Sequence, residues 1–123
     1  MENLNYSTLV RDRFERPPNA GRLLGDVIRG AAGEKSHGTR VEFDLRMRGG
    51  LVERARFRAY GCPHAIAAAS WVAEQAEGRS PESNEWLDPL RLADVLELPE
   101  YKLGVLLVVE DAFRDATSKA CGS

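Results

Sequence analysis

The residues of this sequence best suited to chemistry lie at a Gly-Cys corner, Gly61-Cys62. An alternating segment ends there, and Pro63 and an alanine-rich run follow at once. Because proline suits the first position of a helix, this order predicts a strand that ends at the corner and a helix that begins directly behind Cys62. Helix N-termini carry partial positive charge and unpaired N–H groups, which favour the thiolate, the form of cysteine that binds metals and attacks sulfur. Cys62 is therefore predicted to be a functional thiol, the alternative being a small buried hydrophobic side chain.

A sheet of three segments is expected to carry this corner. The clearest segment is residues 39–48, where apolar residues alternate with charged ones, as in a strand with one buried and one solvated face. Gly49-Gly50 is a hairpin signal, and the alternation resumes in the strand after it, with apolar residues at 55, 57 and 59 and arginines at 54, 56 and 58. With a first strand over residues 23–32, the pattern predicts an antiparallel meander whose arginines lie on solvated strand faces.

Helices are needed to cover the apolar face of this sheet. They are expected over residues 6–15, 63–77, 88–96 and 99 to about 116. In the first helix, Leu9, Val10 and Phe14 can share one face. In the last helix, a strand over residues 105–109 remains an alternative, because periodicity alone does not separate the two. The predicted fold class is α+β, a three-stranded antiparallel sheet covered by helices.

The chain as a whole is expected to form a single domain, residues 1–123, of ordinary globular composition, with 43% apolar and 29% charged residues. Its net charge of −2 indicates neither a nucleic acid nor an anionic membrane as a partner. The longest apolar run, residues 105–109, is too short to span a bilayer, and the N-terminus lacks the layout of a signal peptide, so a cytoplasmic location is expected. Besides Cys62 the chain has one other cysteine, Cys121, which is expected to be an exposed thiol near the chain end.

Three stretches of the sequence, in order and correctly spaced, resemble the IscU/NifU-type iron–sulfur cluster assembly scaffolds. Residues 55–70 resemble the second cysteine motif of that family most closely. Residues 6–21 resemble its opening helix and the turn after it, and residues 98–112 resemble its last helix. The resemblance covers nearly the whole chain and implies the family's fold, a small antiparallel sheet covered by helices.

The family's cluster site, as the resemblance implies it, uses three cysteines, an aspartate, and a histidine beside the third cysteine. In this sequence His37 stands at the first cysteine and Thr39 at the aspartate. Gly104 stands at the histidine and Val105 at the third cysteine. Only Cys62 keeps the family identity, so the chain is a divergent member that lacks two of the three cluster cysteines.

The metal ligands that the chain can still offer are few. His37 occupies a family ligand position in a loop, where a solvated histidine is the alternative. His64 is a weaker candidate, since it follows Cys62 by two residues and side chains at that spacing do not face each other on a helix. A two-iron cluster normally takes four protein ligands, mostly thiolates. Iron or an iron–sulfur cluster is the expected cargo, and a single zinc ion is possible.

Two classes of function follow from the resemblance. In the first, the protein is a cluster scaffold or carrier and not an enzyme, and it completes its site across a homodimer and accepts sulfur from a cysteine desulfurase at Cys62. In the second, it is a degenerate scaffold homologue that binds a single zinc or iron ion or only the protein partners of the assembly machinery. The segment that resembles the family's chaperone-docking motif keeps Leu98, Pro99 and Lys102, which are expected to bind a partner.

Overall fold

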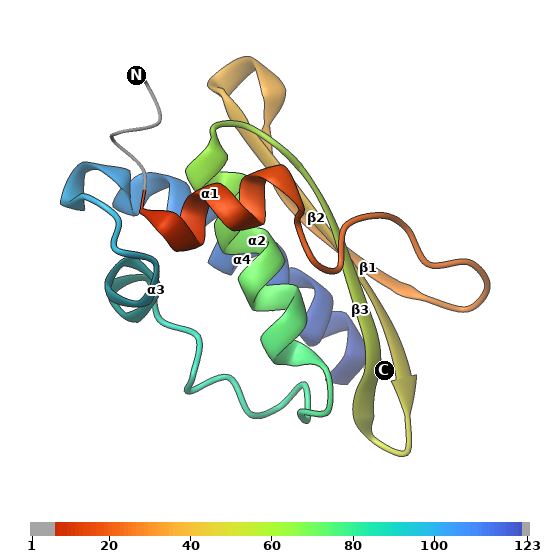
Figure 1. Cartoon of the computed structure of the whole chain (residues 1–123). Helices are drawn as coiled ribbons and strands as arrows, with labels where there is room; N and C mark the ends of the chain where they lie inside the picture. The colour runs from red at the N-terminus through yellow and green to blue at the C-terminus, as the bar shows by residue number, and fades with distance from the viewer. Residues whose placement is uncertain (1–6, 122–123) are drawn as a thin grey trace.

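A computed structural model describes residues 7–121 and contains one three-stranded sheet with helices on one side (Figure 1). The strands pair in the order β1-β2-β3, antiparallel throughout, which confirms the predicted meander. In chain order the elements are α1 (Thr8–Glu15), β1 (Ile28–Glu34), η2 (Lys35–His37), β2 (Thr39–Arg48), β3 (Leu51–Tyr60), α2 (Pro63–Ala76), α3 (Pro89–Leu96), η3 (Glu100–Lys102) and α4 (Leu103–Cys121).

The hairpin turn lies where the sequence predicts it, β2 has the predicted bounds, and β3 contains the predicted alternating residues. Gly49 and Gly50 both have positive φ, 61° and 79°, which the tight turn between β2 and β3 requires. Along β2, Val41, Phe43 and Leu45 are fully buried and face the helices. The same pattern that sets the register therefore also sets which face of the sheet is covered.

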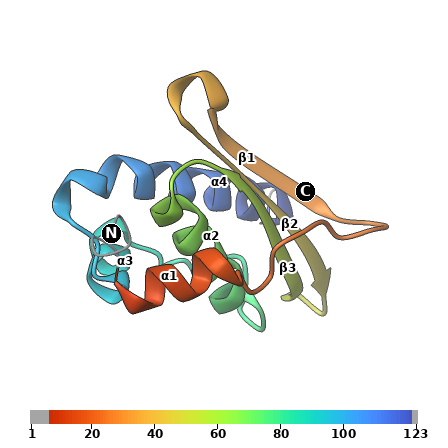
Figure 2. The same ribbon diagram turned by 45° about the horizontal axis from the view of Figure 1, so that its top comes forward.

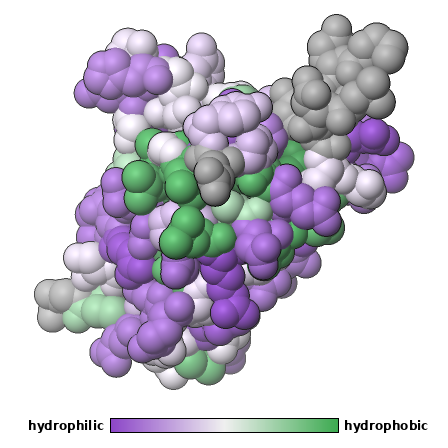
Figure 3. All heavy atoms as spheres, turned by 90° about the vertical axis from the view of Figure 1, so that its left-hand side faces the viewer, coloured by the Kyte–Doolittle hydropathy of each residue, from purple (hydrophilic) through white to green (hydrophobic). Residues whose placement is uncertain are grey.

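Two helices lie directly on the sheet, and the other two lie on them (Figures 1 and 2). α2 packs on β3, and α4 packs on β1 and β2. Of the outer helices, α1 contacts α2, and α3 contacts α4. α3 and the start of α4 form the end of the molecule shown in Figure 3, where exposed apolar side chains lie among polar ones. In residues 7–121 no helix has the length and apolar character needed to cross a bilayer.

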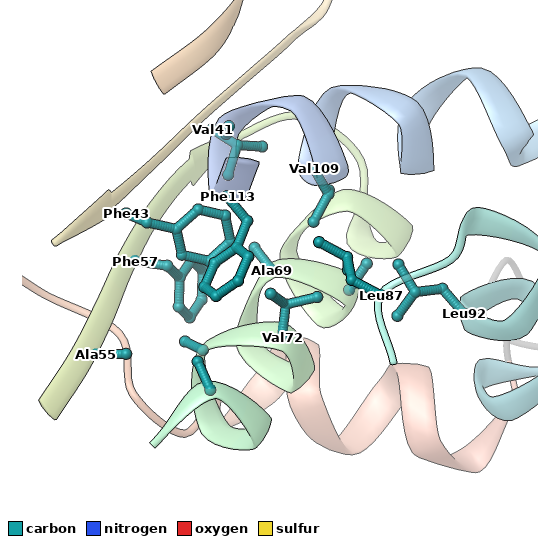
Figure 4. Close-up of a cluster of buried hydrophobic side chains, with 14 of the residues drawn as sticks. Val41, Phe43, Ala55, Phe57, Ala69, Val72, Leu87, Leu92, Val109 and Phe113 are labelled. Carbon is teal, nitrogen blue, oxygen red and sulfur yellow. The ribbon is translucent and has the colours of Figure 1, made fainter. Parts of the chain in front are cut away.

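The core lies between the sheet and the α2–α4 layer (Figure 4). Phe43 of β2 meets Phe113 of α4 edge-on, with ring centroids 5.4 Å apart, and Trp86 meets Phe113 at 5.6 Å. Small residues of α2, including Ala69, let this helix lie close to β3. The core therefore ties the helix that begins at Cys62 to the strand that ends just before it.

The first strand begins later than the sequence predicts, at Ile28 instead of Leu23. Gly25 has a φ of 86°, which interrupts the extended backbone. The N–H of Leu23 donates to the Asp44 carboxylate at 3.0 Å instead of joining the ladder. Residues 22–27 thus belong to the connection from α1, which pairs with the edge of β3 at Ala20 and crosses the outer face of the sheet.

Three helix predictions also need correction. α4 begins at Leu103, after the 3-10 turn η3, and runs to Cys121, five residues beyond the predicted end. Residues 105–109 are part of this helix, so the alternative of a strand there is wrong. α1 begins at Thr8 with Ser7 as its N-cap, and Tyr6 lies outside the described residues. On α1 only Val10 is buried, whereas Leu9 and Phe14 are exposed.

Candidate functional site

Cys62 is the N-cap of α2, as predicted, and is half-buried. Its carbonyl accepts hydrogen bonds from the N–H groups of Ala65 and Ile66, at 3.0 and 3.2 Å. Its side chain makes no capping hydrogen bond. The backbone of Cys62 therefore starts the helix while the thiol stays available for other chemistry.

Gly61 allows the corner to lie against the loop that follows β1. A Cβ atom at this position would lie 3.2 Å from the Cβ of Ala65, 3.4 Å from the carbonyl oxygen of Gly38 and 3.5 Å from Oγ1 of Thr39. These separations leave little room for a side chain. The structure therefore brings two of the three family site segments, residues 37–39 and 61–62, side by side.

The third family site segment, residues 104–105, closely follows Lys102 in the sequence, and Lys102 contacts Cys62. The Nζ of Lys102 lies 3.8 Å from Cys62 Sγ and donates to it. Lys102 ends η3, a turn closed by its own N–H bonding to the Pro99 carbonyl at 3.0 Å. The sequence predicted Lys102 as a partner-binding residue and gave no sign of this contact, because the two residues are 40 positions apart. A positive charge thus lies next to Cys62, which is the only thiol at this site among the described residues.

The two histidines lie in different environments. His37 ends η2 and is exposed, directly before Gly38, which has a φ of 96°. His64 lies in the first turn of α2 and is only 3% exposed. Burial lowers the pKa of His64, and the positive charge of Lys102 lowers it further, so both favour the neutral form of its imidazole.

The remaining family positions offer no metal donors. Gly104 is exposed and Val105 half-buried, both in the first turn of α4 and close in sequence to Lys102. Within residues 7–121 there is no group of three or more His, Cys, Asp or Glu side chains placed to hold one metal ion. The three family segments therefore converge without the family's set of ligands.

Cys121 cannot join Cys62 within the same chain. It is exposed at the last residue of α4, whereas the contact between Lys102 and Cys62 lies at the first turn of that helix. Eighteen residues of α-helix separate the two ends by about 27 Å. Cys121 is thus a surface thiol at the opposite end of α4 from the site.

Comparisons with known proteins agree with this architecture. The chain matches the NifU-like N terminal domain family over residues 5–121. It is 34% identical over 115 residues to the iron–sulfur cluster assembly scaffold protein IscU of Azotobacter vinelandii, covering 90% of each chain. It is 33% identical over 115 residues to the IscU of Escherichia coli K12, again covering 90% of each chain.

Solved structures give the same fold. The N-terminal part of a NifU-like protein from Brucella abortus superimposes with a TM-score of 0.70 at 18% identity, covering 98% of each chain. A SUF-system scaffold protein from Fervidobacterium islandicum AW-1 superimposes with a TM-score of 0.73 at 16% identity, covering 95% of this chain and 99% of the other. With sequence match and fold in agreement, the chain belongs to the NifU-like N-terminal domain family, alongside the IscU scaffolds.

Proposed function

We propose that this protein acts in iron–sulfur cluster assembly as a scaffold-like or carrier protein, and that Cys62 is its point of attachment for iron, a cluster or sulfur. The relatives named as IscU scaffolds share a third of their residues with it over nine-tenths of its length. The observation that carries the role of Cys62 is its place at the convergence of the three family site segments, with the Lys102 ammonium 3.8 Å from its sulfur.

Residues 7–121 of one chain do not supply the ligands for a two-iron cluster. Such a cluster normally takes four protein ligands, mostly cysteine thiolates, and histidines can replace the cysteines on one of the two irons. Residues 7–121 offer Cys62 and the exposed His37 at this end, with no three-donor group. The cluster is therefore cargo whose ligand set is completed from outside the chain. A homodimer with two copies of Cys62 and His37 provides two thiolates and two imidazoles.

Sulfur delivered by a cysteine desulfurase has one acceptor at this site, because the family's other acceptor position is Val105. The terminal sulfur of a desulfurase persulfide moves to the Cys62 thiolate, and the desulfurase cysteine leaves as a thiolate. Lys102 provides a positive charge beside the reacting sulfur. The protein forms no product of its own in this scheme, so we class it as a non-enzyme, and we place it in the cytoplasm, where thiols stay reduced.

Assembly chaperones are the second class of partner that we propose, at the segment containing Leu98, Pro99 and Lys102. Leu98 packs against the core, and Pro99 is half-buried at the start of the turn. Large apolar side chains of α3, η3 and the first turns of α4 are exposed, namely Leu90, Tyr101 and Leu107. Exposed apolar side chains on the elements around this segment are suited to a protein partner.

A second candidate function is a homologue that binds one zinc or iron ion or only protein partners. The absence of a three-donor group in residues 7–121 favours the partner-only form of this function, because catalytic zinc takes three protein ligands and structural zinc four, so that a metal ion would need donors from outside these residues. The two candidates differ in what the protein carries, which reconstitution with iron and sulfide can measure.

Anaerobic reconstitution with iron and sulfide is expected to load the wild-type protein with a cluster that depends on Cys62. Absorbance, Mössbauer spectra, iron content and native mass measure the product, and the expected product is a dimer. Cys62→Ala is expected to lose the cluster, whereas Cys121→Ala, which removes the other thiol, is expected to keep it. If zinc binds through Cys62 and no cluster forms, the scaffold role is wrong. If neither binds, both metal-carrying functions are wrong and the partner-only function gains support.

Restoring the family's donors is expected to produce a site within one chain. The variant His37→Cys/Thr39→Asp/Gly104→His/Val105→Cys places donors on the segments that converge at Cys62. Its cluster content in the monomer fraction is expected to rise above that of the wild type, because the ligands no longer have to come from a second chain. Adding Cys62→Ala to this variant is expected to abolish the gain. Equal cluster content in monomers of the variant and the wild type would mean that the segments do not converge as described.

A further inference from the structure

The outer face of the sheet, turned away from α2 and α4, carries much more positive than negative charge. Opposite residues in the ladder share a face, so the residues on the side of Asp44 and Glu42 can be read from the register. Up to the irregularity at Arg46/Met47, the strands place two carboxylates, Glu42 and Asp44, and six arginines on this outer face, namely Arg29, Arg40, Arg46, Arg54, Arg56 and Arg58. The whole chain has a net charge of −2, so this face has the opposite sign to the rest of the molecule.

The two carboxylates hold three of these arginines in place. Asp44 is fully buried and pairs with Arg29 at 2.8 Å and with Arg58 at 3.3 Å. Glu42 pairs with Arg40 at 3.1 Å and also with Arg58. Because each carboxylate is shared between two guanidinium groups, N–H donors remain for a ligand. Since the guanidiniums are already fixed, little side-chain entropy is lost when they bind one.

Two adjacent hollows open along this face. One has a volume of about 330 Å³ and is lined by Lys35, Arg40, Glu42, Arg58, Ala59 and Tyr60. The other has a volume of about 260 Å³, shares Arg40 and Glu42 with the first, and adds further cations from Arg22, Arg29 and Lys119. The connection from α1 covers the remainder around Asp44, through the Leu23 N–H. The open part of the face is therefore concave and cationic. The first hollow reaches Tyr60, which precedes Cys62 by two residues in the sequence.

We propose that these two hollows bind a segment of a partner protein that is rich in aspartate and glutamate. Arginine forks match carboxylates two N–H groups at a time. Glu42 lines both hollows, and its ion pairs with Arg40 and Arg58 offset its negative charge toward a carboxylate that enters either one. The surface is distinct from Cys62 and from the Leu98–Lys102 segment, and the inference holds whether or not the protein carries a cluster.

Fluorescence anisotropy with a labelled decapeptide of glutamate, at about 0.05 M salt and pH 7, tests the proposal. The wild-type protein is expected to bind it, and a decapeptide of glutamine is expected not to bind. Arg22→Glu/Lys35→Glu reverses one exposed charge in each hollow and is expected to weaken binding by at least about tenfold. Arg22→Gln/Lys35→Gln is expected to give a smaller loss in the same direction.

Arg11→Glu/Arg91→Glu is the matched control. It makes the same change in net charge at exposed positions of α1 and α3, away from the sheet, and is expected to leave the affinity within about twofold of the wild type. The proposal is overturned if the wild type does not bind the glutamate peptide, if the glutamine peptide binds equally well, or if both double variants weaken binding equally. Displacement of the peptide by a single-stranded DNA decamer at lower concentration than by unlabelled peptide would show that the partner class is wrong.

Discussion

Gly30→Ala is expected to destabilise the protein by about 3 kcal/mol, one of the two largest effects of a single substitution considered for this fold. A Cβ atom at Gly30 would lie 2.2 Å from the backbone nitrogen of Ala116, 2.5 Å from its Cα and 2.7 Å from the carbonyl oxygen of Ala112. Because these are backbone atoms of α4, no change of rotamer can relieve the overlap, and the whole helix must move away from β1. Thermal unfolding is expected to show a melting temperature lower by about 10 °C.

Gly104→Ala is the control for this prediction. Nothing lies within 4 Å of a Cβ atom at Gly104, which is in the first turn of α4 and exposed. Alanine favours a helix more than glycine does, so this variant is expected to be more stable than the wild type by about 0.5 kcal/mol. A neutral or stabilising effect of Gly30→Ala would contradict the close packing of α4 on β1, on which the placement of the Lys102 end of α4 also depends.

The β2–β3 hairpin was the part of the fold that the sequence predicted best. The alternation along residues 39–48 and 54–59 and the Gly49-Gly50 turn define the hairpin locally, and β2 has the predicted bounds. Pro63 and the Asp88-Pro89 pair likewise mark the first residues of α2 and α3, where Asp88 caps the N–H of Leu90 at 2.9 Å. These features are encoded by neighbours in sequence, which is why a single sequence is enough to find them.

Features that depend on distant segments were missed. Asp44 alternates with apolar residues and was expected on a solvated face with the arginines, yet it is fully buried, because the connection from α1 folds over it and two arginines pair with it. The contact between Lys102 and Cys62 was missed for the same reason. The position of Cys62 at a helix N-terminus was predicted correctly, whereas the ligand roles of His37 and His64 stay predictions.

Asp44→Asn is expected to destabilise the protein by about 2 to 3 kcal/mol at pH 7. Asp44 is the buried group on which Arg29, Arg58 and the Leu23 N–H converge, and removal of its charge leaves the two guanidiniums without their shared partner. The expected cost lies below the largest values for broken buried ion pairs, because both arginines keep partial contact with water. Urea unfolding at pH 7 measures it. Glu53→Gln removes the exposed pair with Arg48 and is expected to cost less than about 0.5 kcal/mol.

The same substitution is expected to change how the free energy of unfolding depends on pH in the acidic range. Burial alone would raise the pKa of Asp44, but the hydrogen bonds from Arg29, the Leu23 N–H and Arg58 outweigh it, and the pKa lies below its ordinary value of 3.8. A carboxyl group whose pKa is lower in the folded protein stabilises it fully above the pKa of the unfolded chain, and this stabilisation is lost as the pH falls through the folded-state pKa. The free energy of unfolding of the wild type is therefore expected to fall as the pH drops below about 4, and that of Asp44→Asn to fall less steeply. Glu42 and Asp115, whose pKa values are also lowered, contribute to the loss of stability in acid in both proteins, so the variant keeps part of this pH dependence. Parallel pH profiles for the wild type and the variant would mean that Asp44 is not the anchor of the arginines on the outer face.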